Sequence, residues 1–131
     1  MKYIIDTHTF LWFSEGSTQL SIQSRKIIED TNNEIFVSIA SLWEISIKTS
    51  LSKLEISGTY ESVLEDVINA NMEILPINFL HTVYQNKLPF HHKDPFDRMI
   101  VSQALAEKMS LISRDEILDN YFMESNEKRI W

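Results

Sequence analysis

Cysteine is absent from the 131-residue sequence, which excludes disulfide bridges, thiolate zinc sites and cysteine redox chemistry. Glycine and proline are scarce, with two and three residues, and there is no low-complexity tract or internal repeat. Nothing in this composition indicates a linker or a second domain. We therefore expect a single domain over residues 1–131, with 44% hydrophobic residues available for its core.

Long apolar runs are also missing. The chain reaches Asp6 too early for the apolar stretch of a signal peptide, and no run approaches the ~18 residues of a membrane helix. We therefore expect a soluble, cytoplasmic protein. Basic residues are few, because 12 Lys and Arg stand against 19 Asp and Glu, for a formal net charge of −7. In a nucleic-acid enzyme, such a net charge could be explained by acidic residues that gather around bound cations. It could also be explained by an acidic surface that suits a basic protein partner.

Short β-rich runs alternate with longer segments of helical periodicity. The predicted strands are residues 2–5, 34–38, 72–76 and 110–113, and the tail 128–131 is a candidate edge strand. The predicted helices are residues 9–13, 21–30, 40–50, 59–69, 78–84 and 95–108. Parallel neighbours in a sheet need crossover connections, which helices supply. The alternation therefore predicts an α/β fold with a central parallel sheet covered on both faces.

Four acidic residues stand near the carboxyl ends of predicted strands. Asp6 directly follows the first strand, and Asp115 follows the strand 110–113 closely. Glu44 lies in the first turns of the helix after the second strand, and Asp97 lies near the start of the helix that leads to Asp115. Ligands of open parallel sheets bind beyond the carboxyl ends of the strands. We therefore expect these four side chains to converge.

Carboxylates that lie close together repel one another, so a folded protein keeps such a cluster only with protons or cations to neutralise it. Oxygen ligands without cysteine or a patterned histidine pair favour Mg²⁺, with Mn²⁺ as the alternative. Such ions activate water and stabilise the charge that develops on a phosphodiester during in-line attack. The pattern therefore predicts hydrolysis of phosphodiester bonds.

Each acid also has a structural interpretation. Ser41 and Glu44 match a capping box, and Asp115 could merely open a turn. Asp94 is a suitable N-cap for the helix that starts at residue 95, and Asp97 would then lie in its first turn. We assign Asp94 mainly to capping. An Asp97 in the first turn can still point toward a metal.

The basic residues near these acids are candidates for substrate binding. Lys48, Arg98 and Arg114 are the main ones, and His91, His92 and Lys93 would complete a rim that meets phosphates, with a solvated loop as the equally open alternative. Adjacent histidines on a loop point apart, and no further histidine completes a zinc set, so metal ligation by His91 or His92 is not expected. The aromatic residues after Asp6, namely Phe10, Trp12 and Phe13, are assigned to the core rather than to base stacking.

The segments that carry the acids resemble the PIN-domain family, and in detail the VapC-like toxins of prokaryotic toxin-antitoxin modules. They are Tyr3-Ile4-Ile5-Asp6-Thr7-His8, Val37-Ser38-Ile39-Ala40-Ser41-Leu42-Trp43-Glu44, His91-His92-Lys93-Asp94-Pro95-Phe96-Asp97-Arg98 and Ser113-Arg114-Asp115. A short motif such as Ser-Arg-Asp is unspecific alone, but four segments in this order extend the resemblance over essentially the whole chain.

The resemblance implies a three-layer α/β/α PIN-like fold and an Mg²⁺-dependent endoribonuclease that is inhibited by a cognate antitoxin protein. It also implies a homodimer. Carried over by position, Asp6 and Asp97 would hold the metal most directly, and Glu44 and Asp115 would complete the shell or orient the attacking water. Ser113 corresponds to a small polar residue near the last acid. Asp94 beside Asp97 departs from the family pattern and leaves open which carboxylate faces the metal.

Two other classes of function remain as alternatives. A phosphatase or phospho-acceptor could use Asp6 as a nucleophile, although a haloacid-dehalogenase-like site would need a second Asp at position 8, where the chain has His8. A catalytically silent PIN-like module could act only by binding a protein partner. The sequence does not identify the RNA that a nuclease of this kind would cleave.

Overall fold

The computed structural model describes all 131 residues and contains one five-stranded sheet. Its strands are β1 (Lys2–Ile5), β2 (Glu34–Ser38), β3 (Glu73–Leu75), β4 (Ser110–Ile112) and β5 (Arg129–Ile130), in the order β3-β2-β1-β4-β5. All neighbouring pairs are parallel. The candidate edge strand in the C-terminal tail is therefore confirmed as β5.

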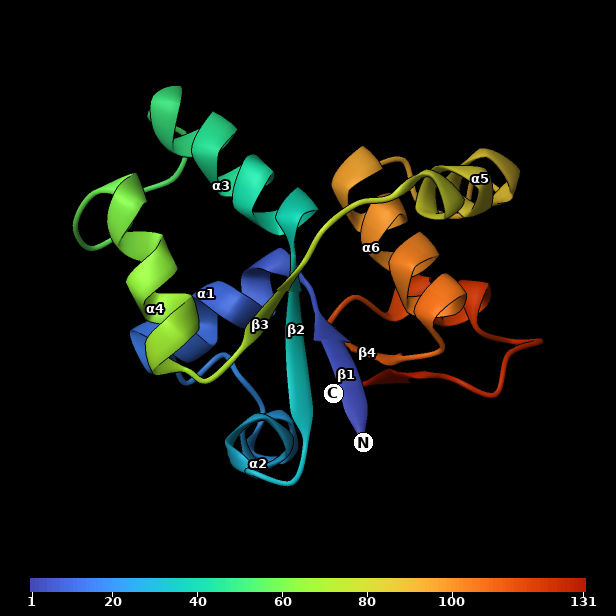
Figure 1. The fold of residues 1–131 in the computed structure, drawn as a ribbon, viewed down its shortest axis with the longest axis horizontal. Helices are drawn as coiled ribbons and strands as arrows, with labels where there is room; N and C mark the ends of the chain where they lie inside the picture. Colours follow the sequence, from blue (N-terminus) through green and yellow to red (C-terminus); the bar gives the residue numbers. More distant parts are fainter.

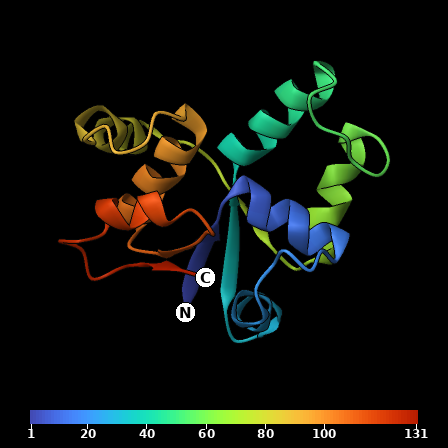
Figure 2. The same cartoon turned by 180° about the vertical axis from the view of Figure 1, so that it is seen from behind.

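Helices cover both faces of this sheet, as Figures 1 and 2 show from opposite sides. They are α1 (Thr7–Glu15), α2 (Ile22–Glu29), α3 (Ile39–Ser50), α4 (Val63–Asn69), α5 (Phe79–Lys87) and α6 (Pro95–Glu107), with 3-10 helices η1 (Tyr60–Ser62) and η2 (Glu116–Tyr121). In Figure 1, α1, α2 and α4 lie on one side of the strands, and α5 and α6 lie on the other. The predicted three-layer α/β/α arrangement is confirmed.

The alternation of side chains along β1 divides the core in two. Tyr3 and Ile5 point to the face covered by α1, α2 and α4, where Phe10 is also buried. Ile4 points to the face covered by α6 and η2, where it joins Ile100. The assignment of Phe10 to the core is thus confirmed, and Trp12 and Phe13 pack against the same cluster. None of the helices is long and apolar enough to cross a membrane.

The start of α3 differs from the prediction. The hydroxyl of Ser38, the last residue of β2, accepts a hydrogen bond from the backbone N–H of Ala40 at 2.9 Å and caps the helix. The helix therefore begins at Ile39, and Glu44 lies in its second turn, beyond the reach of the helix start. The capping-box interpretation of Ser41 and Glu44 is wrong, and the Glu44 side chain needs another explanation.

Candidate active site at the carboxyl ends of the strands

Asp6 connects β1 to α1 and is almost completely buried, at 7% exposure. Its Oδ1 accepts a hydrogen bond from the backbone N–H of Thr9 at 2.9 Å, so Asp6 is the N-cap of α1. Its Oδ2 accepts a hydrogen bond from the Ser113 hydroxyl at 2.5 Å. Burial raises the pKa of Asp6, although these two donors act in the opposite direction. The structure thus holds this carboxylate firmly just beyond the end of β1.

Glu44 lies on α3 with 4% of its surface exposed. Its Oε1 accepts a hydrogen bond from the Thr7 hydroxyl at 2.6 Å, which ties α3 to the residue after Asp6. Its Oε2 pairs with the Lys48 ammonium group one turn later, at 2.5 Å. Hydrogen bonding to Glu44 is the largest cause of the raised pKa of Lys48. Glu44 is therefore a buried carboxylate with a cationic partner.

Asp115 and Ser113 follow β4. The Ser113 hydroxyl accepts a hydrogen bond from the backbone N–H of Asp115 at 3.1 Å while it donates to Asp6. The Oδ1 of Asp115 accepts from the backbone N–H of Ile117 at 3.1 Å and caps η2. Asp115 therefore opens a helical turn, as one interpretation of the sequence expected. Through Ser113 it is also linked to the carboxylate of Asp6.

Asp97 lies in the first turn of α6, whose N-cap is Asp94. The Oδ1 of Asp94 accepts hydrogen bonds from the backbone N–H groups of Phe96, at 2.8 Å, and Asp97, at 3.3 Å. The assignment of Asp94 to capping is confirmed. The Asp97 carboxylate has no hydrogen bond from the protein, and only the His92 ring approaches it, with Nε2 at 3.5 Å from Oδ2. It is the one carboxylate of the four without a close protein donor.

Asp97 is affected by the negative charges of the other three acids and of Asp94. The pKa of Asp97 is raised to about 8, and burial is the largest cause. The negative charges of Asp6, Asp94, Glu44 and Asp115 contribute to the same shift, in decreasing order. The negative charge of these neighbours therefore disfavours the ionised form of Asp97. The structure brings together the acids that the sequence singled out.

His92 also lies at this site, but it contacts the acids, whereas the sequence analysis placed it in a rim that meets phosphates or in a solvated loop. Its Nε2 lies 2.9 Å from Oδ2 of Asp115, and its Nδ1 accepts a hydrogen bond from the backbone N–H of Asp94 at 3.0 Å. His91 points away and packs its ring against Tyr121, so the two histidines diverge as expected. The position of His92 just before a helix N-cap was visible in the sequence, but its approach to Asp115 depends on the tertiary fold.

The PIN domain family matches residues 3–121, which is most of the chain. The chain belongs to the PIN domain family. The resemblance that its motifs carry is therefore confirmed at the level of the family. No curated protein matches the chain.

Several solved structures share this PIN fold. VapBC2 from Rickettsia felis has a TM-score of 0.70 and 18% identity, with 100% of both chains covered. FitAcB from Neisseria gonorrhoeae has a TM-score of 0.62 and 14% identity, with 98% of this chain and 96% of that chain covered. A PilT N-terminus domain protein from Sulfolobus solfataricus has a TM-score of 0.60 and 12% identity, with 99% and 86% covered. At these identities the likeness shows the fold, and function must be argued from the site.

The structure of this PIN domain contradicts one member of the predicted basic rim, Arg98. Arg98 is 3% exposed, and its guanidinium donates to the backbone carbonyls of Gln85, Leu88 and Pro89 and to the Tyr121 hydroxyl. It cannot contact a phosphate, so its assignment to substrate binding is wrong. Lys48 is partly exposed but paired with Glu44. Arg114 is exposed beside Trp12 and remains free to meet a substrate.

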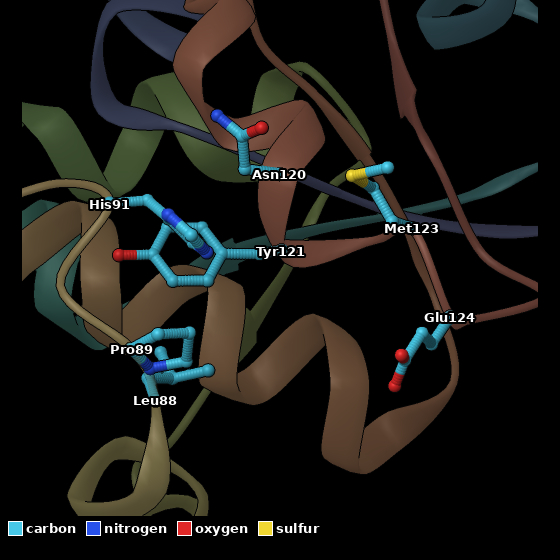
Figure 3. A pocket seen from close by; sticks show the side chains of 7 residues that line it. All are labelled: Leu88, Pro89, His91, Asn120, Tyr121, Met123 and Glu124. Atoms are coloured by element: carbon cyan, nitrogen blue, oxygen red, sulfur yellow. The ribbon is translucent and has the colours of Figure 1, made fainter.

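A pocket of about 500 Å³ lies beside the loop that leads to His92. Figure 3 shows its lining, where the His91 ring lies against the Tyr121 ring near Pro89. The other lining residues are Leu88, Asn120, Met123 and Glu124. None of the four acids lines this pocket, so the carboxylate cluster of the PIN domain is a separate, polar feature.

The donor atoms of the cluster fit a hard divalent cation. All four acids supply carboxylate oxygens, and Asp97 keeps both of its oxygens free of close protein donors. Oxygens of Asp97 and Asp115 lie within 4.8 Å of each other and of the His92 ring nitrogen. A cation would remove the repulsion that raises the pKa of Asp97. Mg²⁺ and Mn²⁺ both prefer such ligands.

Proposed function

We propose that this PIN-domain protein is a metal-dependent endoribonuclease, with Mg²⁺ as the working ion and Mn²⁺ as a possible substitute, and that it is the toxin of a prokaryotic toxin-antitoxin module. The observation that carries the proposal is the Asp97 carboxylate. It has no close protein donor, lies among three other acids, and has a pKa raised to about 8. Such an arrangement is costly unless a cation compensates it.

The proposed reaction is hydrolysis of an RNA phosphodiester. A water oxygen forms a bond to phosphorus, the bond from phosphorus to the 3′ oxygen breaks, and that oxygen takes a proton. The products carry a 3′-hydroxyl and a 5′-phosphate. When bound, a divalent cation at such a site lowers the pKa of water and offsets negative charge at the phosphate.

Different residues of the chain would have different roles in this hydrolysis. Asp97 and Asp6 would bind the cation, because they lie at the starts of α6 and α1 and converge beyond the strand ends. Asp115 would complete the shell of the cation or orient the attacking water, because hydrogen bonds to both of its oxygens hold the carboxylate in one orientation. Glu44 would complete the negative field, and Lys48 balances part of its charge.

Arg114 is the basic residue that we propose to contact the RNA backbone. It follows Ser113, is exposed, and makes only a long hydrogen bond, at 3.5 Å, to Gln19. Lys48 could make a second contact from the edge of the cluster, where its side chain is 39% exposed. Both lie on the carboxyl side of the strands, near the acids.

We also propose a cognate antitoxin as the protein partner, and a homodimer as the assembly. VapBC2 is described bound to a DNA fragment from its promoter, and FitAB is described bound to the IR36 DNA fragment. A net charge of −7 suits a basic segment of such a partner. RNA and antitoxin would both be met in the cytoplasm, which we propose as the location. Light scattering of the purified protein, alone and with the product of the adjacent gene, tests both assemblies.

A phospho-acceptor role for Asp6 is disfavoured by the same geometry. Asp6 is 7% exposed, and its two oxygens accept hydrogen bonds from Thr9 and Ser113. A nucleophilic carboxylate needs an oxygen that can reach a phosphorus atom. The deep position and full engagement of Asp6 fit a ligand better than a nucleophile.

The test is cleavage of a mixed RNA pool by the purified protein, in Mg²⁺ and in EDTA. We expect cleavage only with Mg²⁺, and a loss of more than about 100-fold in Asp97→Asn, as for other residues that position a catalytic metal. Asp94→Asn is the matched control, because Asn caps a helix as well as Asp and should preserve most of the activity. Cleavage by Asp97→Asn at the wild-type rate would overturn the assignment.

A further inference from the structure

His92 forms two hydrogen bonds that together determine which ring nitrogen carries the proton. Its Nδ1 faces the backbone N–H of Asp94 at 3.0 Å, and an amide N–H can only donate. Nδ1 must therefore be the unprotonated nitrogen. The proton is then on Nε2, which lies 2.9 Å from Oδ2 of Asp115.

The same assignment excludes His92 as a metal ligand in this arrangement. A ligating nitrogen needs a free lone pair, and the lone pair of the neutral ring is at Nδ1, turned toward Asp94. The Nε2–H instead faces Asp115 and, at 3.5 Å, Asp97. The nearness of the ring to these carboxylates therefore reflects hydrogen-bond donation.

The loop around His92 fixes the ring in place. The backbone N–H of His92 donates to the Tyr121 hydroxyl at 2.9 Å, and Tyr121 belongs to η2, the helix that Asp115 caps. The side chain is 18% exposed. Asp94 holds the other side of the ring while it caps α6. The ring is thus held from the two elements that carry Asp97 and Asp115.

We propose that His92 is a positioning residue that holds Asp115 in place for cation binding by donating a hydrogen bond from Nε2. Asp115 has Oδ1 committed to the N–H of Ile117 and Oδ2 committed to His92, so the carboxylate is held in one orientation. Without His92, Oδ2 loses its only protein donor. Residues that orient ligands in this way typically contribute about 10–100-fold to metal affinity or activity. The inference rests on the proposed metal-dependent function.

The experiment compares the same substitution at two adjacent histidines. His92→Phe removes the donor, and His91→Phe keeps an aromatic ring against Tyr121 and leaves the acids untouched. His92→Gln supplies an amide N–H that can replace the Nε2 donor. Mn²⁺ affinity is measured by calorimetry, and Mn²⁺-bound protein is examined by pulsed electron paramagnetic resonance for coupling to a ring nitrogen.

We expect His92→Phe to weaken Mn²⁺ binding by about 10-fold or more, as a lost orienting partner does. We expect His92→Gln to stay within about threefold of the wild type on the same measure and His91→Phe to be unchanged. No nitrogen coupling should appear. If His92→Phe does not fold, His92→Asn replaces it, because its shorter amide does not reach Asp115 and should weaken binding equally.

Wild-type Mn²⁺ affinity in His92→Phe would overturn the proposal, and so would a nitrogen coupling that shows direct ligation. Neither measurement needs RNA. If the wild type binds Mn²⁺ but cleaves no RNA, the proposed endoribonuclease function fails while the role of His92 is still decided by the affinities. If RNA is cleaved and His92→Phe binds Mn²⁺ as tightly as His91→Phe, the positioning role of His92 is refuted while the proposed endoribonuclease function stands.

Discussion

Asp97 and Asp6 are both acids at the start of a helix, but their surroundings differ in one respect. Asp6 accepts hydrogen bonds on both oxygens, whereas the carboxylate of Asp97 accepts none within close range. Donors stabilise the ionised form of Asp6 against its burial. At Asp97 burial and neighbouring charge act together, so this residue should respond to both pH and cations.

The raised pKa of Asp97 predicts how stability depends on pH. The ordinary value is 3.8 and the value in the metal-free protein is about 8, so the folded state holds a proton that the unfolded chain releases. The contribution of Asp97 to metal-free stability is therefore greatest at low pH and is lost as the pH rises from about 4 to about 8. Melting temperatures measured in EDTA from about pH 5 to about pH 8 should decrease, and saturating Mg²⁺ should offset the decrease.

Asp97→Asn removes the titrating group, so its melting temperature should depend less on pH and exceed that of the wild type at about pH 8. Asp6, whose pKa is also raised, would keep a dependence in the same direction. Asp94→Asn serves as the control, because it leaves Asp97 in place and should retain most of the slope. An unchanged slope in Asp97→Asn would show that this carboxyl group is ionised in the metal-free protein.

At the scale of elements, Arg98 shows why a basic residue beside the site was misassigned. From the sequence, its place next to Asp97 suggested a phosphate contact. In the fold it points from α6 to the carbonyls at the end of α5 and the following loop, and its guanidinium lies 4.0 Å from the centre of the Phe90 ring. The planar guanidinium can satisfy several carbonyls at once, which lysine cannot.

Arg98→Lys should therefore destabilise the protein by about 2–4 kcal/mol, because buried carbonyls and the Tyr121 hydroxyl lose donors. Urea unfolding measures this loss. Arg25→Lys is the matched control, since Arg25 forms a partly exposed pair with Glu29 at 3.6 Å, and its change should stay within about 0.5 kcal/mol. Equal effects of the two substitutions would contradict the structural role of Arg98.

The Tyr121 hydroxyl joins η2 to the loop that carries His92. It accepts hydrogen bonds from the backbone N–H of His92 and from Arg98. Tyr121→Phe should cost about 1–3 kcal/mol and increase hydrogen exchange at the His92 amide. Tyr60→Phe also loses a tyrosine hydrogen bond, to the carbonyl of Leu42, but should leave that amide protected. If the His92 amide exchanges at the same rate in both variants, Tyr121 does not hold the loop.

The elements that the sequence predicted well are those with strong local signals. The short apolar run of β1 and the Asp94-Pro95 start of α6 predicted the structure closely. The start of α3 was misplaced by one residue, because Ser38 ends a strand and caps a helix at once. The helix η2 was missed, since its first turn depends on a single Asp115 cap. The four acids were found from their order along the chain, whereas the His92 contact depends on tertiary packing.

At the scale of the whole molecule, the net charge of −7 must coexist with the proposed binding of RNA. The cluster of acids lies at one end of the sheet, where β1, β2 and β4 end and α3 and α6 begin (Figure 1). Because Arg98 is buried, few exposed basic side chains remain at this end. Attraction of the RNA backbone would therefore depend on a small number of phosphate contacts, together with the cation.

This arrangement predicts a shallow salt dependence of RNA binding. With Lys48, Lys93 and Arg114 as the available contacts, the slope of log affinity against log salt should be about −2 in the Asp97→Asn background, because each contact to a single strand contributes about −0.7. Adding Arg114→Ala should make the slope shallower by about 0.7.

Lys26→Ala is the control for that measurement. Lys26 is an exposed residue of α2, which Figure 1 places at the opposite end of β2 from α3, so its loss should leave the slope unchanged. Fluorescence anisotropy of a labelled single-stranded RNA over a series of KCl concentrations gives the slopes. Equal slopes for Arg114→Ala and its Asp97→Asn parent would mean that RNA approaches the acids without Arg114. A slope much steeper than about −2 would require a basic surface elsewhere on the molecule, or one that a partner supplies.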